Sequence, residues 1–448
     1  MNIITRVVKN NMRAACILSA LLLVLWSWLL QIDAAIISNN VFVGYFIAGF
    51  VLLVILAVNL LILNLTARYI KKQTSKSKIT NLAILFIVSS VALWLASWLV
   101  TVIWYGEGAS LDNVLPFTSA TPFVVQTPFR YLTRLFGYHG TTALLIVLVY
   151  SLYKRSYRRI GVVIFVVVLA TNITSYLGYR TPNSQTVTAT IVAEKLGDPK
   201  QINAQTDLVV LPEYGLDDTD NNNLPLRLKG RQDSYFVGSK QVQSGRGNKN
   251  SLLFGTVGLG IGGEHEKSRL IVGGEYLAYT VEPWLRIFSS STYTNFQVTR
   301  SVIRGDDKLK PLNVTDNIVL GAAVCSSIVN TEDYRKLTND GATILSNSAS
   351  LEIFSGSSLF AVQHRGLATF MAVANARPFL QSSNNWSAFA LDHNGKLLKQ
   401  TLPTSSAVVD VVQNGKTTPY TVLGEWSVTL GALYMLVSFT IKLKKRFS

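Results

Sequence analysis

The sequence has few of the residues that most often build metal centres and covalent cross-links. Among 448 residues there are two cysteines, Cys16 and Cys325. The first lies in a long apolar run and the second in a mixed pattern of strands and helices, so they are poor disulfide partners. The histidines are dispersed and lack metal-ligand spacing: His139, His265, His364 and His393. We expect no metal site, and a fold held together by disulfides is excluded.

The sequence also contains no complete nucleotide-binding motif. No glycine loop ends in Gly-Lys-Ser or Gly-Lys-Thr. The segment GLGIGG formally matches a dinucleotide fingerprint through Gly258, Gly260 and Gly263. A charged stretch, residues 264–267, follows it where that motif requires an apolar helix face. We therefore expect no dinucleotide cofactor.

Acidic residues are absent from the four segments that carry the densest positive charge. These segments hold 16 of the 41 Lys and Arg residues and account for the whole net charge of +16. They are residues 6–13, 68–78, 154–159 and 442–446. Because each segment flanks an apolar run, their charge indicates loops that stay on the cytoplasmic side of a membrane. Nucleic acid is a poor explanation for the basicity.

Six apolar runs are long enough to cross a bilayer. They are residues 14–31, 41–64, 81–104, 136–153, 160–176 and 422–441, the last interrupted by Glu425 near its start. Residues 115–131 contain three prolines, which favours a re-entrant or interfacial segment. We expect a membrane domain of about five spans at 1–179, an extracytoplasmic domain at 180–421, and a final helix with a basic cytoplasmic tail at 422–448.

The extracytoplasmic domain has the alternating strands and helices of an α/β fold. Strands are predicted at residues 186–193, 208–211, 252–257, 318–324 and 342–345, and helices at 331–340 and 359–376. Asn394-Gly395 predicts a hairpin over 387–399. The polar segment 217–251 is predicted to be an exposed excursion.

Cys325 follows the apolar strand at 318–324, and Asn330 caps the helix expected after it. Side chains at the carboxyl ends of such strands line the active sites of α/β folds. A cysteine there can be a nucleophile, although a single cysteine is more often a small buried hydrophobe. An unpaired thiol outside the cytoplasm favours the reactive interpretation.

Two further residues fit a catalytic thiol. Glu213 emerges after the strand at 208–211 and Pro212, where it could take the thiol proton. Lys267 could stabilise the oxyanion of a tetrahedral intermediate. Taken alone, each is more often a solvated surface residue.

In this order, Glu213, Lys267 and Cys325 resemble the nitrilase, or carbon–nitrogen hydrolase, superfamily. With membrane spans on both sides, the chain is similar to its apolipoprotein N-acyltransferase branch. There the glutamate follows a strand and Pro, as in LVVLPE, and the nucleophile follows small residues, as in GAAVC. The lysine lies eight positions before a glutamate, as Lys267 lies before Glu275 in KSRLIVGGEY. The segment QHRGLATFMAVANARPFLQSSN resembles another motif of that branch.

The resemblance implies a four-layer α-β-β-α sandwich facing outward from a bacterial inner membrane. It implies an acyl chain moving from a phospholipid, through a cysteine thioester, to the amine of a diacylglyceryl-cysteine lipoprotein, with no cofactor. Glu275 would support the lysine. An aromatic set could line an acyl entrance or serve ordinary packing: Tyr276, Tyr279, Trp284 and Phe288.

The chain also departs from the family pattern. Ser327 stands where the family usually has a glutamate, Gly273 replaces a proline, and six spans replace the usual eight. These departures leave two alternatives open: an amidase or divergent acyltransferase with another acceptor, and a catalytically silent scaffold.

Overall fold

The computed structural model describes residues 41–105, 120–179 and 185–447, apart from short gaps. The gaps are residues 74, 76, 199, 218, 221, 245–246, 272–274, 278, 280, 300, 306–307, 316 and 355–356. The first predicted span, at 14–31, lies outside the described residues, and so does Cys16.

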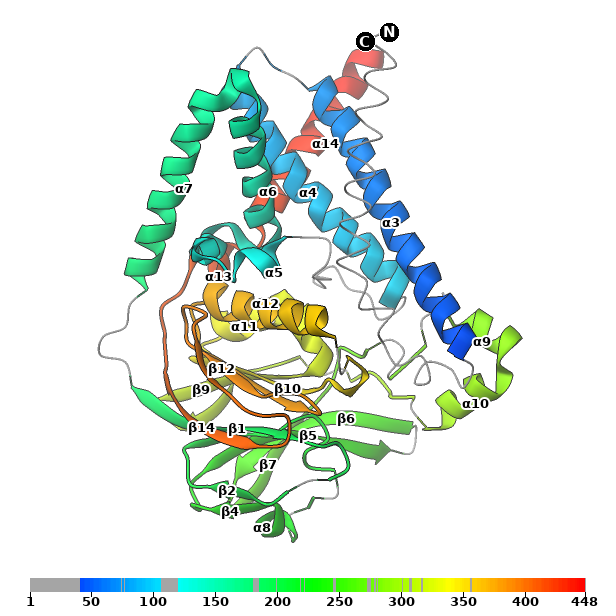
Figure 1. Cartoon of the computed structure of the whole chain (residues 1–448), viewed down its shortest axis with the longest axis vertical. Coiled ribbons are helices and arrows are strands. Elements are labelled where there is room, and N and C mark those ends of the chain that lie inside the picture. Colours follow the sequence, from blue (N-terminus) through cyan, green and yellow to red (C-terminus); the bar gives the residue numbers. More distant parts are fainter. Residues whose placement is uncertain are drawn as a thin grey trace.

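Five helices in the described part are long and apolar enough to cross a membrane. They are α3 (Val41–Lys72), α4 (Lys78–Tyr105), α6 (Thr133–Tyr153), α7 (Arg158–Gly178) and α14 (Trp426–Phe447). They match the second to sixth predicted spans. The basic ends of α3, α7 and α14 lie at the end of the bundle opposite the α/β domain (Figure 1).

Helix α6 is broken near its start, where Gly137 has a φ of 68° that favours glycine. The amides of Tyr138 and His139 begin the second half of the helix and donate to Glu425 at 2.5 and 3.1 Å. A carboxylate here satisfies free N–H groups and complements the positive end of the helix dipole. The acid that interrupts the last predicted span therefore lies just before α14 and caps part of α6.

The proline-rich segment 115–131 is described from residue 120 onward. The described part forms two short helices, α5 (Thr121–Val124) and η4 (Pro128–Leu132). Helix α5 packs closely on the α/β domain, because a Cβ on Gly366 would come within 2.3 Å of the Pro122 carbonyl oxygen.

The α/β domain contains one curled sheet with the order β7-β6-β5-β3-β1-β11-β10-β9-β8. Strand β14 pairs with β1, and the β12–β13 hairpin pairs with β11. The strands are β1 (Thr186–Glu194), β3 (Leu208–Val210), β5 (Tyr235–Ser244), β6 (Gly247–Thr256), β7 (Gly260–Glu266), β8 (Leu312–Thr315), β9 (Ile318–Val324), β10 (Ile344–Ser350), β11 (Phe379–Asn384), β12 (Phe389–Leu391), β13 (Leu397–Gln400) and β14 (Ser406–Val412). The parallel pairs β3–β1–β11–β10–β9 place their carboxyl ends at a common edge.

The sheet folds into two halves that pack on each other. Strands β1 and β11 pair only at their carboxyl ends, through Ala193–Ser383 and Glu194–Asn384. A single apolar core joins both halves, with Ile191 on one side and Leu320 on the other. Helices α11 (Thr331–Asn339) and α12 (Ser358–Ala374) cover the outer face of the half that contains β9 to β11.

The outer face of the other half has a thinner cover. It consists of the strand pair β2 (Ile202–Ala204) and β4 (Leu228–Gly230) with one helical turn, α8 (Leu224–Arg227). The predicted fold class, apolar helices with a layered α/β domain, is confirmed.

Two local predictions were wrong. The segment 217–251 is not an exposed excursion: it supplies β5 and the start of β6, and Phe236 and Val237 are fully buried. Its many Asn, Gly and Lys residues hid a strand that is half polar. Asn330 precedes α11 as predicted, but its side chain makes no cap hydrogen bond.

Arg134 forms hydrogen bonds that connect the helical bundle to the α/β domain. This side chain of α6 is 1% exposed. Its guanidinium donates to the carbonyls of Val373 and His393 at 3.0 and 2.9 Å, and to that of Ser175 at 2.9 Å. One arginine thus joins α6, α7, the end of α12 and the β12–β13 hairpin.

Candidate active site

Cys325 stands on a sharp elbow at the end of β9. The strand stops at Val324, and Cys325 begins the 3-10 helix η6 (Cys325–Val329) with a φ of 45°. A non-glycine residue in this region is strained, and such strain is common at active sites. The elbow turns Sγ toward β10, 3.9 Å from the Ser350 carbonyl oxygen.

Glu213 reaches the same point from the end of β3. The strand ends at Val210, shortly before Pro212, and the backbone carbonyl of Glu213 accepts from the side-chain amide of Asn384 at the end of β11. One carboxylate oxygen, Oε2, accepts from the Ser350 amide N–H at 3.0 Å. The carboxylate is therefore aimed by two neighbouring strands and is 2% exposed.

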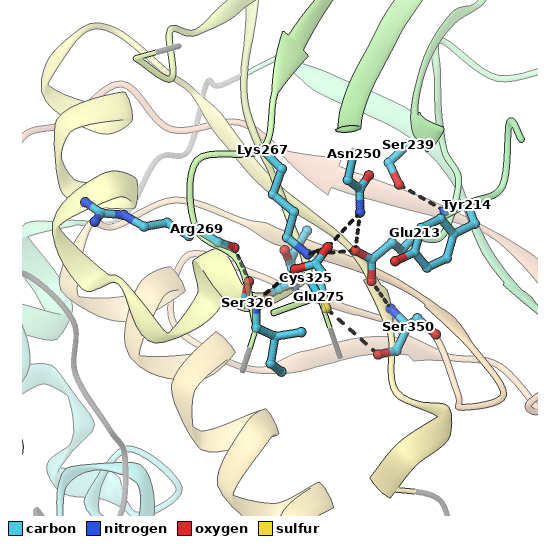
Figure 2. A network of polar contacts seen from close by, with 12 residues as sticks. Glu213, Tyr214, Ser239, Asn250, Lys267, Arg269, Glu275, Cys325, Ser326 and Ser350 are labelled. Atoms are coloured by element: carbon cyan, nitrogen blue, oxygen red, sulfur yellow. Dashed lines mark hydrogen bonds and ion pairs between the residues drawn. The ribbon is translucent and has the colours of Figure 1, made fainter. Parts of the chain in front are cut away.

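Lys267 completes the cluster from the end of β7 (Figure 2). Its Nζ lies 2.8 Å from Glu213 Oε1 and 2.8 Å from Glu275 Oε1. Glu275 is fixed in turn by the Ile271 N–H, which donates to its Oε2 at 2.8 Å. The structure thus brings together Glu213, Lys267, Glu275 and Cys325, which are far apart in sequence.

Asn250, on β6, is a member of this cluster that the sequence did not reveal. Its Nδ2 donates to Glu213 Oε1 at 2.8 Å and to Glu275 Oε1 at 3.2 Å. One amide therefore separates two carboxylates that would otherwise repel each other. It also positions the lysine, because its carbonyl oxygen accepts from the Lys267 N–H at 2.7 Å. Asn250 lies in the segment 217–251, which the sequence predicts to be an exposed excursion, and no motif marks it.

Burial and charge set the protonation of the cluster. Burial alone lowers the pKa of a lysine, but Glu213 and Glu275 outweigh it and hold the pKa of Lys267 well above its ordinary value. Burial raises the pKa of Glu275 despite the attraction of Lys267. Burial and the charge of Glu213 raise the pKa of the Cys325 thiol well above its ordinary value, against the pull of Lys267. At neutral pH the lysine is charged and the cysteine is a thiol.

A second set of contacts ties the lysine loop to the elbow. The Ser326 hydroxyl donates to the Arg269 carbonyl oxygen, and the Arg269 guanidinium lies 3.5 Å from Asp333 at the start of α11. Ser327, the residue after Ser326, is buried at 3% exposure. These contacts join the segment after Lys267 to the segment after Cys325, and so help to fix the distance between the two side chains.

The aromatic set lies apart from this cluster for the most part. Tyr276 packs against the core between the sheet halves, whereas Tyr279 is 54% exposed. Trp284 and Phe288 stack on each other, with ring centroids 5.8 Å apart, on helix α9 (Glu282–Phe288). Trp284 also lies against Phe46 of α3 at 6.0 Å. Helix α9, which carries Trp284 and Phe288, lies beside the end of α3 nearest the α/β domain (Figure 1).

The structure also shows where the glycine-rich segment lies and whether acidic, histidine and cysteine side chains cluster. The GLGIGG segment forms the turn between β6 and β7 and the start of β7, so it continues into a strand rather than a helix. In the described part of the chain, no three His, Cys, Asp or Glu side chains are grouped so that they could hold a metal ion.

Two of the solved structures that are similar to this chain are named as members of the carbon–nitrogen hydrolase, or nitrilase, superfamily. A carbon–nitrogen hydrolase from Helicobacter pylori is 16% identical and covers 51% of this chain and 89% of its own, with a TM-score of 0.36. A mutant Nesterenkonia amidase of the nitrilase superfamily is 11% identical and covers 53% of this chain and 93% of its own, with a TM-score of 0.37.

Curated sequences similar to this chain carry a more specific name, apolipoprotein N-acyltransferase. The one from Photobacterium profundum is 27% identical over 34% of this chain and 29% of its own. The one from Vibrio parahaemolyticus is 23% identical over 56% of this chain and 51% of its own. The match thus spans about half, or less, of the length of these relatives. No family model matches the chain.

Proposed function

We propose that this chain is a membrane-embedded N-acyltransferase that uses Glu213, Lys267 and Cys325. The observation that carries the proposal is the placement of Lys267 between two carboxylates beside a cysteine on a strained elbow. A buried cluster of one cation and two acids is costly to assemble, and such groups mark functional sites. The name shared by the sequence relatives supports the acyltransferase class.

In the first step, Glu213 takes the proton of the Cys325 thiol as Sγ attacks the ester carbonyl of a phospholipid. Lys267 stabilises the oxyanion, and Glu275 holds the lysine in place. The C–O bond of the ester then breaks, and the leaving alcohol takes the proton back from Glu213. The products are a thioester on Cys325 and a lysophospholipid.

In the second step, the free amine of a diacylated lipoprotein attacks the thioester. Glu213 accepts the proton that the amine loses, and the C–S bond breaks to release the thiolate. The thiolate recovers that proton, so an amide is formed and the enzyme returns to its starting state. The first step starts from a protonated thiol and the second step restores it, which agrees with the raised pKa of Cys325.

The domain limits follow from the same proposal. Residues 1–179 and 422–448 form the membrane part, and residues 180–421 form the catalytic domain outside the inner membrane of a bacterium. The basic ends of the helices, opposite that domain, support this orientation.

We propose that the acyl chain enters between α9 and α3. Trp284 and Phe288 are 37% and 62% exposed, and Trp284 lies next to Phe46 on a membrane helix. An apolar surface at that position suits a lipid tail leaving the bilayer. Tyr276, which packs on the core, would lie at the inner end of this path and Tyr279 at its outer edge.

One experiment distinguishes acyl transfer to a lipoprotein amine from acyl transfer to water. The full chain in detergent is incubated with phospholipid and a synthetic diacylated lipopeptide that has a free amino terminus, and intact masses are measured. A gain of one acyl mass on the lipopeptide supports the transferase. Release of free fatty acid without that gain would show that the chain is a hydrolase and not a transferase. No change in lipid or lipopeptide would favour a catalytically silent scaffold.

A further inference from the structure

A second site lies where the membrane helices meet the α/β domain. A cavity of about 390 Å³ opens between η4, helix α12 and the β12–β13 hairpin. The residues that matter for its chemistry are Arg130, Tyr131, Arg365, Thr369, Lys396 and Leu397. None of them contacts Glu213, Lys267 or Cys325 in the described part of the chain.

The cavity is positively charged. Arg130, Arg365 and Lys396 line it, and no Asp or Glu does. The two arginines donate to neutral acceptors: Arg130 to the Gly395 carbonyl at 3.0 Å and Arg365 to Gln400 Oε1 at 2.6 Å. Within the described residues, none of the three cations forms an ion pair. Three unneutralised cations around one hollow favour an anionic ligand.

Arg365 is held ready for such a ligand. Its guanidinium lies over the Phe389 ring, 5.3 Å from the centroid, and this cation–π contact helps to hold the side chain at the cavity. Burial lowers the pKa of Arg365, because its charge is poorly hydrated. A bound anion would restore the favourable interactions that water supplies elsewhere.

The cavity opens at the level where a bilayer would end. Arg130 and Tyr131 belong to η4, which begins the apolar stretch Pro128–Tyr153. This turn is tied to α7, because Asn172 donates to the Pro128 carbonyl at 2.7 Å and Phe129 lies 6.5 Å from Phe165. Helix α7 exposes an apolar face above it, with Val162, Val166 and Ile173 all about half exposed or more. A lipid with its head in the cavity could therefore lay its chains along α7.

We propose that this cavity binds the phosphate of an anionic glycerophospholipid from the leaflet next to the α/β domain, with Arg365 and Lys396 as the main contacts. The three lining cations favour a headgroup with a net negative charge, so phosphatidylglycerol fits better than the zwitterionic phosphatidylethanolamine. The bound lipid would join η4, α12 and the β12–β13 hairpin and hold the domain on the membrane surface. This role is separate from the proposed acyl transfer.

Native mass spectrometry of the full chain in detergent tests the proposal. Dioleoyl phosphatidylglycerol is titrated into wild-type protein, into the double variant Arg365→Gln with Lys396→Gln, and into Lys399→Gln as a matched control on exposed β13. We expect the wild type to retain one lipid per chain more than the double variant, in which the affinity of this site is about ten-fold lower or weaker still, and no change in Lys399→Gln. Equal lipid retention by the wild type and the double variant would overturn the proposal.

Two further ligands test which part of the lipid the cavity binds, and these tests need only the wild-type protein. Dioleoylglycerol has the same chains and no phosphate, and wild-type retention of it equal to that of phosphatidylglycerol would overturn the proposal. Displacement of the lipid by millimolar inorganic phosphate would assign the site to free phosphate and also overturn the lipid assignment. Because the readout is binding, a loss of acyl transfer would leave these results unaffected.

Discussion

At the scale of single residues, the cluster around Cys325 places two opposing demands on Glu213. Its negative charge raises the pKa of the thiol, and its carboxylate is the base that must remove the thiol proton. Charge and basicity therefore act in opposite directions on the reactivity of the cysteine. A single substitution can separate the two effects.

We expect Glu213→Gln to make Cys325 easier to ionise but slower to acylate. In the wild type, alkylation of Cys325 by iodoacetamide should still be rising above pH ~8.5, the ordinary pKa of a thiol. The glutamine removes the charge that opposes ionisation and leaves Lys267 in place, so the alkylation midpoint should move to lower pH. Mass spectrometry of the alkylated peptide measures this midpoint. A midpoint that stays in place or moves upward would contradict the electrostatic description.

Asn250 gives a second prediction at this scale. Asn250→Ala removes the amide between Glu213 and Glu275, and hydrogen bonds to charged groups contribute about 1.5–3 kcal/mol. We expect acylation of Cys325 to slow by roughly ten- to one-hundred-fold. Asn248→Ala, two residues earlier on β6, is the control and should keep the wild-type rate. Equal rates in both variants would remove Asn250 from the site.

At the scale of elements, the sequence predicted those whose pattern is local. The strand at 318–324 and the hairpin at Asn394-Gly395 were located correctly because an apolar run and a turn dipeptide define them. Strand β5 was missed because it is half polar, and its burial comes from the β2–β4 cover and the sheet neighbours. Asn250 was missed because its role depends on contacts that are distant in sequence: its partners lie 37 and 25 residues away.

The break in α6 can be tested as an element. Glu425→Gln keeps the size of the side chain but removes the charge that caps Tyr138 and His139. A lost cap costs about 1 kcal/mol, so we expect a lower thermal unfolding midpoint in detergent and faster amide exchange at residues 138–141. Glu264→Gln, on the exposed edge strand β7, is the control. An unchanged midpoint and exchange rate would mean that the carboxylate does not stabilise the break.

At the scale of the whole molecule, the account depends on orientation. Three basic helix ends lie opposite the α/β domain, which predicts that the domain faces away from the cytoplasm. In a chain with Cys16→Ser and Cys325→Ser, a membrane-impermeant thiol reagent should label Asn222→Cys in intact spheroplasts and should not label Ser75→Cys. Both positions are exposed in the fold, so accessibility differs only through the membrane. Labelling of Ser75→Cys with Asn222→Cys protected would invert the orientation and remove the lipoprotein acceptor.

The thioester on Cys325 tests the central claim most directly. The wild type is supplied with phospholipid and no acceptor, and the peptide that carries Cys325 is weighed. We predict a gain of one acyl mass that hydroxylamine removes, and no gain in Cys325→Ala. Lys267→Ala should form the adduct more slowly, by about 2.7–4 kcal/mol in activation free energy if it acts like one oxyanion donor. A wild-type peptide that never gains the mass, or a Cys325→Ala variant that consumes phospholipid at the wild-type rate, would contradict the account.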